Sequence, residues 1–159
     1  MSKTVLVTGG AGFIGSSFVH YLKTKYPDYR ILILDALTYA GEFGNLPEGV
    51  NDPKNPQIQF WYGNVCNQGL VANLAKEANI VVHFAAETHV TRSIFDNLVF
   101  FETDVIGTHS MMNVAIAADS IERFIHISTS EVYGTAVTDT MTEDHPLNPS
   151  SPYASAKCG

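Results

Sequence analysis

Tyr153 and Lys157 are four positions apart and could carry acid–base chemistry. On a helix, residues i and i+4 share one face, so the lysine ammonium would lie beside the phenol. A neighbouring positive charge favours the ionised phenol. A phenolate can accept a proton from a substrate hydroxyl. The same spacing often occurs by chance, so its weight comes from the motifs that precede it.

A second polar group, Thr129, Ser130 and Glu131, follows an apolar run at residues 123–128. If that run is a parallel strand, the three side chains lie at its carboxyl end, where ligands bind in open α/β sheets. Glu131 is therefore a candidate proton acceptor. The alternative is a solvated loop carboxylate.

A glycine cluster lies between a β-branched run at residues 4–8 and an apolar helical pattern at residues 13–25. Its spacing satisfies GxxGxxG through Gly9, Gly12 and Gly15, and GxGxxG when Gly10 replaces Gly9. Such a turn needs positive φ and a close approach of backbone to pyrophosphate, with the helix N–H groups facing the phosphate. The pattern predicts a dinucleotide site.

Asp35 ends the next apolar run, twenty residues after Gly15. A carboxylate there can bond the adenosine ribose hydroxyls, and it would repel a 2′-phosphate. NAD is therefore favoured over NADP. The alternative is a plain strand-to-helix turn followed by an incidental aspartate.

The elements that must position these residues alternate along the chain. Strands are predicted at residues 4–8, 30–34, 57–62, 80–84 and 123–128, and helices at 13–25, 70–78, 95–118 and from 152. Residues 36–56 form a long loop broken by glycine and proline. This order predicts one α/β domain over residues 1–159, a Rossmann-type doubly wound parallel sheet with helices on both faces.

Composition limits the partners and the location. The 159 residues are 45% hydrophobic and carry a formal charge of -7, which argues against nucleic acid or an anionic membrane as partner. No apolar run could span a membrane, and residues 1–8 lack the features of a signal peptide. We expect a cytoplasmic protein, with Cys66 and Cys158 as reduced thiols and with no metal.

Three basic side chains lie in or just after the predicted strand at residues 80–84. His83, within a predicted strand, is interpreted as a packed structural histidine. His89 and Arg92 follow the end of that strand and could reach a substrate.

Four motifs together resemble the extended short-chain dehydrogenase/reductase family: TGGAGFIG, HFAAETHVTRSI, ISTSEVYG and SPYASAK, which begin at residues 8, 83, 127 and 151. They occur in the family's order along the whole chain. LDALTYAG, from residue 34, and AAETHVTRSI are most similar to the dTDP-glucose 4,6-dehydratases of its nucleotide-sugar branch.

The resemblance implies a redox-neutral cycle on bound NAD. The sugar is oxidised at C4, loses the C5 proton and then water, and receives hydride at C6. The implied catalytic residues are Thr129, Ser130, Glu131, Tyr153 and Lys157, with Thr88 and Thr129 at the substrate. The implied cofactor contacts are Gly9, Gly12, Phe13, Ile14, Gly15, Asp35, Ala36, Leu37, Thr38, Asn64, Val65, Phe84, Ala85, Ala86, Thr88, Thr103, Tyr153 and Lys157.

The chain departs from the dTDP-glucose pattern at three positions. Ser130 replaces an aspartate that could protonate the leaving hydroxyl, and serine alone is too weak an acid for that step. Asn64 and Thr91 also replace aspartates. Ser-Glu resembles the GDP-mannose 4,6-dehydratases and some UDP-glucuronate decarboxylases. A decarboxylase, a 4-epimerase and a non-catalytic NAD-binding module therefore remain alternatives.

The family implies a homodimer through the helix at residues 95–118, and a further substrate-binding part about as long as this chain. We expect the 159 residues alone to bind NAD weakly and to turn over poorly, because a final helix of so few residues frays.

Overall fold

The structure, a computed structural model, describes residues 2–159, which form two compact units. The sheet unit comprises the chain up to Ala85 and the segment Gly107–Ile127. The helical unit comprises Ala86–Ile106 and Ser128–Gly159.

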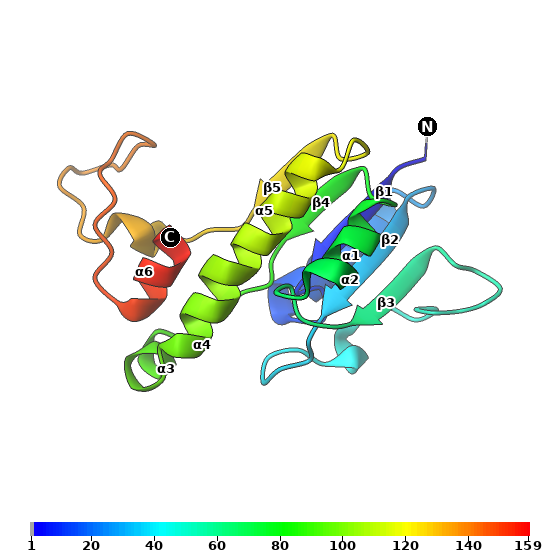
Figure 1. The fold of residues 1–159 in the computed structure, drawn as a ribbon, viewed down its shortest axis with the longest axis horizontal. Helices are drawn as coiled ribbons and strands as arrows, with labels where there is room; N and C mark the ends of the chain where they lie inside the picture. Colours follow the sequence, from blue (N-terminus) through cyan, green and yellow to red (C-terminus); the bar gives the residue numbers. More distant parts are fainter. Residues whose placement is uncertain (1) are drawn as a thin grey trace. The chain divides into compact units, whose positions relative to one another are not determined.

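The sheet unit is built on five parallel strands. They are β1 (Thr4–Thr8), β2 (Arg30–Asp35), β3 (Ile58–Tyr62), β4 (Ile80–His83) and β5 (Arg123–His126). Their order is β3-β2-β1-β4-β5, so the direction of winding reverses between β1 and β4 (Figure 1). In open α/β sheets the ligand crevice lies at this reversal, beyond the carboxyl ends of the strands.

Helices cover both faces of the sheet because side chains alternate along each strand. Val5 and Val7 of β1 pack in one cluster with Val19 of α1 (Phe13–Lys25). Leu6, between them, packs in a second cluster with residues of α2 (Gln68–Ala75) and α5 (Thr108–Ala117). The predicted doubly wound parallel architecture is confirmed.

The register of the strands brings the predicted cofactor residues to one edge. Thr8, the last residue of β1, pairs with Leu34 in β2 and with His83 in β4. The residues that follow these positions, Gly9, Asp35 and Phe84, therefore emerge together at the carboxyl edge.

His83 is a packed structural histidine, as predicted. It is 1% exposed, its Nδ1 lies 2.6 Å from Thr8 Oγ1, and its Nε2 lies 3.1 Å from Thr108 Oγ1. Thr8 Oγ1 also accepts the Ala85 N–H at 3.3 Å. These bonds hold the ends of β1 and β4 together just below the glycine turn.

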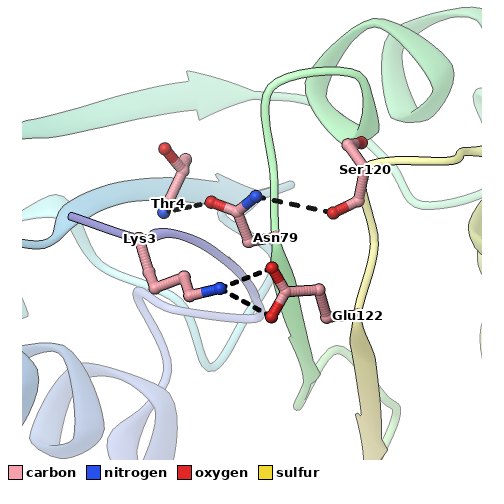
Figure 2. A network of polar contacts seen from close by, with 5 residues as sticks. All are labelled: Lys3, Thr4, Asn79, Ser120 and Glu122. Atoms are coloured by element: carbon pink, nitrogen blue, oxygen red, sulfur yellow. Dashed lines mark hydrogen bonds and ion pairs between the residues drawn. The ribbon is translucent and has the colours of Figure 1, made fainter. Parts of the chain in front are cut away.

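The opposite edge of the sheet is tied by Asn79 (Figure 2). Its Oδ1 accepts the Thr4 N–H at 2.9 Å, and its Nδ2 donates to the Ser120 carbonyl at 3.5 Å. Its own backbone bonds with Thr4 and Glu122, both at 2.8 Å, complete the connection among the starts of β1, β4 and β5. Beside it, Lys3 forms an ion pair with Glu122.

We expect Asn79→Ala to lower the free energy of unfolding by about 1–2 kcal/mol, because the half-buried Thr4 N–H loses its side-chain acceptor. Glu122→Gln should cost about 0.5 kcal/mol or less, since the ion pair is solvent-exposed. Urea unfolding of the two variants measures the difference. A larger cost for Glu122→Gln than for Asn79→Ala would contradict this account.

The helical unit contains short elements around a small core. They are α3 (Val90–Phe95), α4 (Leu98–Phe100), the part of the π-helix η2 (Phe101–Gly107) up to Ile106, the 3-10 helix η3 (Ser130–Tyr133) and α6 (Pro152–Cys158). Buried Phe100, Tyr153 and Ala156 form this core, with Val90, Val99 and Val105 packed against it.

The predicted helical stretch over residues 95–118 is confirmed from Leu98 to Ala117, but it is not a single regular α-helix. Asp96 and Asn97 separate α3 from α4, and η2 lies between α4 and α5. Two other elements differ from the prediction by two residues at one end. α2 begins at Gln68 rather than at Leu70, because the Asn67 side chain accepts the Leu70 N–H. β5 ends at His126 rather than at Ser128. The long loop contains a 3-10 turn, η1 (Phe43–Asn45). Over residues 2–159, no helix has the length and apolar character needed to cross a membrane.

Candidate functional site

The glycine turn after β1 leaves no room for side chains at two positions. Gly9 has φ +66°, and a Cβ there would lie 2.6 Å from the Ala85 nitrogen. A Cβ on Gly15 would lie 2.1 Å from the Gly9 carbonyl oxygen. Both approaches are far shorter than van der Waals contact, so only glycine fits. The turn thereby brings α1 directly against the end of β1.

The N-terminus of α1 is open to a ligand. Gly12 occupies its N-cap, and within residues 2–159 no side chain caps the first turn. Phe13 and Ile14, its first two residues, are exposed. Uncapped N–H groups and the positive end of the helix dipole attract anions, and the first turn has no acidic residue to oppose one. This end of α1 therefore fits a pyrophosphate.

Asp35, at the end of β2, braces the turn from the side. Its Oδ2 accepts the Ala11 N–H at 2.9 Å and its Oδ1 accepts the Leu37 N–H at 2.8 Å. Each carboxylate oxygen can accept a second hydrogen bond. The carboxylate can therefore hold the backbone and bind ribose hydroxyls at the same time, a bracing role that the sequence did not suggest.

The loop after β2 folds back onto the glycine turn. The Ala11 carbonyl accepts the Glu42 N–H at 3.1 Å and the Asn45 Nδ2–H at 2.9 Å. Leu37 has φ +47°, an uncommon conformation for a branched side chain. The long loop thus supports the site and places Leu37 and Thr38 near its rim.

The remaining predicted cofactor residues fall in both units. Ala36, Asn64, Val65, Phe84 and Ala85 belong to the sheet unit, and Ala86, Thr88 and Thr103 to the helical unit. The Asn64 Oδ1 accepts the Cys66 N–H at 2.8 Å, so this side chain shapes the turn after β3.

Tyr153 is held firmly at the start of α6. The Ser151 side chain caps this helix by accepting the Ala154 N–H at 3.0 Å, and Pro152 occupies its first turn. The Tyr153 N–H donates to Ser93 Oγ at 3.1 Å, and the ring packs edge-to-face on Phe100. Tyr153 is 8% exposed. Its backbone and ring are therefore fixed by contacts that do not use the phenol oxygen.

Lys157 lies one turn further along α6 and is partly buried. Burial lowers the pKa of its ammonium, and the nearby Asp104 carboxylate raises it. Asp104 and Glu87 are both buried in the helical unit, and neither was predicted from the sequence. Asp104 lies in a predicted helix and Glu87 in the segment after a predicted strand. Acidic residues in both settings usually face water, so no signal in the sequence distinguished these two.

Thr129 is the N-cap residue of η3, and its Oγ1 accepts the Glu131 N–H at 3.3 Å. Ser130 and Glu131 are exposed, so a ligand can reach both. Gly134, with φ +66°, ends the turn where the Asn148 carbonyl passes too close for any Cβ. η3 contacts α6.

All five predicted catalytic residues lie in the helical unit, on η3, its N-cap and α6. His89 is the exposed residue before α3, and Arg92 is exposed within that helix. A threonine and a carboxylate on one short turn, with a tyrosine and a lysine on the adjoining helix, can donate and accept protons around an alcohol.

The chain is similar to several known proteins over nearly its whole length. The family model described as GDP-mannose 4,6 dehydratase matches residues 6–159. A dTDP-glucose 4,6-dehydratase from an Actinoplanes species is 42% identical over 160 residues, covering 98% of this chain and 49% of the relative. The chain thus spans about half the length of the curated relatives it matches.

Solved structures of nucleotide-sugar enzymes are also similar to this chain. The dTDP-glucose 4,6-dehydratase DesIV from Streptomyces venezuelae, with NAD bound, is 44% identical with a TM-score of 0.87, over 98% of this chain and 48% of that one. A UDP-glucose 4-epimerase from Brucella ovis, also with NAD, is 26% identical with a TM-score of 0.84, over 98% and 45% respectively. The chain is similar to enzymes of two different reactions.

Proposed function

Because the chain belongs to the GDP-mannose 4,6-dehydratase family, we propose that it supplies the NAD site and the acid–base residues of a nucleotide-sugar 4,6-dehydratase. The product would be a nucleotide 4-keto-6-deoxy sugar. A dTDP-glucose-like substrate is favoured, since similar chains carry that name. The observation that carries the proposal is the placement of Tyr153, Lys157 and the Thr129–Glu131 turn on adjoining elements of one unit.

The glycine turn fits the cofactor. The uncapped start of α1 would hold the pyrophosphate of NAD, and Asp35 has acceptor capacity left for the adenosine ribose. A Cβ at Gly12 would point into open space apart from one contact with the Gly9 carbonyl, so its absence leaves room for a close approach. When bound, NAD accepts and later returns the hydride.

The chain's own side chains perform the proton transfers. Tyr153 accepts the proton of the C4 hydroxyl, helped by the charge of Lys157 and by a hydrogen bond from Thr129 to the sugar. Glu131 then accepts the C5 proton, which the new ketone makes acidic. The C6 hydroxyl leaves as water, and Ser130 contributes to its protonation only through a water or another acid, because a serine hydroxyl is too weak.

A second candidate rests on Ser130. Because it cannot serve alone as an acid, the same turn also suits a decarboxylase or a 4-epimerase, which oxidise C4 without eliminating water. An epimerase has no need of a carboxylate at Glu131. A non-catalytic NAD-binding module has no need of Tyr153 and Lys157 together.

Mass spectrometry of nucleotide-sugars incubated with NAD and the polypeptide that carries this chain tests the proposal. The panel contains dTDP-glucose, GDP-mannose, UDP-N-acetylglucosamine and UDP-glucuronate. Loss of one water from a single member supports a dehydratase and identifies its substrate. Loss of carbon dioxide, or inversion at C4 detected by proton NMR of the same mixtures, overturns dehydration in favour of the second candidate.

Glu131→Gln should lower the rate of water loss by about 10²–10⁴-fold, because the C5 proton loses its acceptor. Hydride transfer at C4, followed as NADH absorbance in a single turnover, should persist. Glu143→Gln, at an exposed acid elsewhere in the helical unit, is the matched control and should leave both rates unchanged. Unimpaired dehydration by Glu131→Gln would remove Glu131 from the mechanism.

We also infer a homodimer and a cytoplasmic location. In the helical unit, α4 and η2 expose Leu98, Phe101 and Ile106, apolar side chains suited to a contact between copies. Cys66 and Cys158 are not joined in a disulfide, which fits a reducing compartment. Light scattering of the purified protein measures the oligomeric state, and a monomer at micromolar concentration would contradict the dimer.

A further inference from the structure

Asp104 is a charged residue in an unusual position. It lies within the π-helix η2 and is 4% exposed, whereas Glu102, two residues earlier, is exposed. π-Helical turns are rare and often occur at functional sites. An acidic side chain is seldom buried unless other groups stabilise its charge. Its surroundings must therefore explain its presence.

Two groups of the helical unit interact with the Asp104 carboxylate. The Glu87 N–H, from the segment after β4, donates to its Oδ1 at 2.7 Å. The Lys157 ammonium, on α6, attracts its charge. Val105, the residue after Asp104, packs against Tyr153 and Ala156 of the same helix, which brings η2 next to α6. Its Oδ2 is buried and has no hydrogen-bond partner among residues 2–159, so it retains acceptor capacity. One carboxylate thus connects three segments that are distant in the sequence.

The pKa of this carboxylate is set by burial, by one hydrogen bond and by two neighbouring charges. Burial raises the pKa of Asp104 to about 6, against the Glu87 N–H and the Lys157 ammonium, which lower it. The Glu87 carboxylate raises it further. Burial lowers the pKa of Lys157, and Asp104 opposes that decrease. Above pH 6 the ionised Asp104 therefore favours the charged lysine, and this support is lost as the pH falls through 6.

We propose that Asp104 is a positioning residue that keeps the Lys157 ammonium charged beside Tyr153 and fixes the Ala86–Thr88 segment through the Glu87 N–H. The role in turnover rests on the proposed function. The charge coupling itself does not, because it is a property of the helical unit that can be measured without a substrate. Asp104 acts through Lys157 and touches no reacting atom.

The test is the titration of Lys157 in the wild-type chain and in Asp104→Asn. The amide keeps an oxygen acceptor for the Glu87 N–H but removes the charge. Loss of one nearby opposite charge should lower the pKa of Lys157 by about one unit. Competitive acetylation across a pH series, read by mass spectrometry of the Lys157 peptide, measures it. Glu102→Gln, the same change of charge at an exposed position of η2, should leave it unchanged.

An unshifted Lys157 in folded Asp104→Asn would overturn the inference, and so would an equal shift in Glu102→Gln. If Asp104→Asn does not fold, the reciprocal variant decides. Lys157→Gln should raise the pKa of Asp104 above its value of about 6, as followed by carboxyl carbon NMR. An unchanged pKa of Asp104 in Lys157→Gln would also overturn the inference.

Failure of the proposed function and failure of the Asp104–Lys157 coupling give different results. Absence of turnover on every nucleotide-sugar, with a Lys157 titration that still depends on Asp104, would count against the proposed function and leave the charge coupling intact. In an active enzyme, Asp104→Asn should move the alkaline limb of the kcat/KM profile to lower pH, because the lysine loses its proton earlier. A merely structural role would reduce activity without moving that limb.

Discussion

Tyr153→Phe is expected to abolish C4 oxidation almost completely, with a loss of about 10³-fold in rate, while the affinity for NAD changes little. The substitution removes only the phenol oxygen. The contacts that fix the residue, its N–H to Ser93 and its ring on Phe100, use other atoms and remain. Activity and folding are therefore separable at this position.

The loss is large because neither Lys157 nor Thr129 can replace the phenol as acceptor of the C4 hydroxyl proton, and Glu131 is assigned to the C5 proton. Burial lowers the pKa of Lys157 and the Asp104 carboxylate opposes that decrease, and in its charged form the ammonium has no lone pair with which to accept a proton. Thr129 Oγ1 already accepts the Glu131 N–H, and a hydroxyl is a weak base. The effect on turnover should therefore be one on kcat rather than on substrate affinity.

The matched control is Tyr133→Phe, in η3 of the same unit, where the ring packs edge-to-face on His145. It makes the same chemical change and should keep most of the activity. Stopped-flow NADH formation measures the rate, and fluorescence titration measures NAD binding. Substantial turnover by Tyr153→Phe would refute the role of the phenol. Loss of NAD binding with the activity would assign Tyr153 to the cofactor site instead.

The sequence predicted the sheet better than the segments between its strands. β1 and α1 have the predicted bounds because a β-branched run and a helical period are local signals that burial reinforces. α3 was missed because six residues without a side-chain N-cap carry almost no signal of their own. η2 was missed for a different reason: the residues FETDVIG fit an α-helix, and the π geometry is set by tertiary packing.

In the site, too, the sequence predicted the features with local signals and missed those that depend on tertiary packing. Glycine spacing and an aspartate after β2 are sequence facts, and the structure places Gly9, Gly15 and Asp35 at one edge of the sheet. No such pattern marks Asp104, since its burial depends on which face of η2 turns toward α6. The bracing bonds of Asp35 were also beyond the sequence, because the Ala11 N–H that it accepts depends on how the glycine turn folds.

Gly15→Ala is the second change with a large expected effect. The added methyl would lie 2.1 Å from the Gly9 oxygen and 2.9 Å from the Gly10 Cα, both backbone atoms that cannot rotate away. α1 would have to move off the end of β1, where its Val19 and Leu22 are packed. We expect the free energy of unfolding to fall by about 1–3 kcal/mol, as for an overpacked core.

Affinity for NAD should fall further than stability, by about 100-fold or more, because displacement of α1 moves its first-turn N–H groups away from the pyrophosphate. Gly69→Ala is a control with the opposite sign. A methyl there meets only Asn67 Oδ1, at 3.6 Å, within the first turn of α2. Alanine at that position should raise the free energy of unfolding by about 0.5–1 kcal/mol and leave NAD binding unchanged.

Comparison of Gly15→Ala with Gly69→Ala shows whether the glycine turn binds the cofactor or only packs α1 against β1. Calorimetric titration with NAD and urea unfolding of both variants provide the two quantities. If Gly15→Ala lost stability but bound NAD within about 3-fold of wild type, the turn would be needed only for packing, and the pyrophosphate would lie elsewhere. A parallel loss in both quantities, absent from Gly69→Ala, is what a site formed at the junction of β1 and α1 requires, because there the same backbone approach creates both the packing and the anion site.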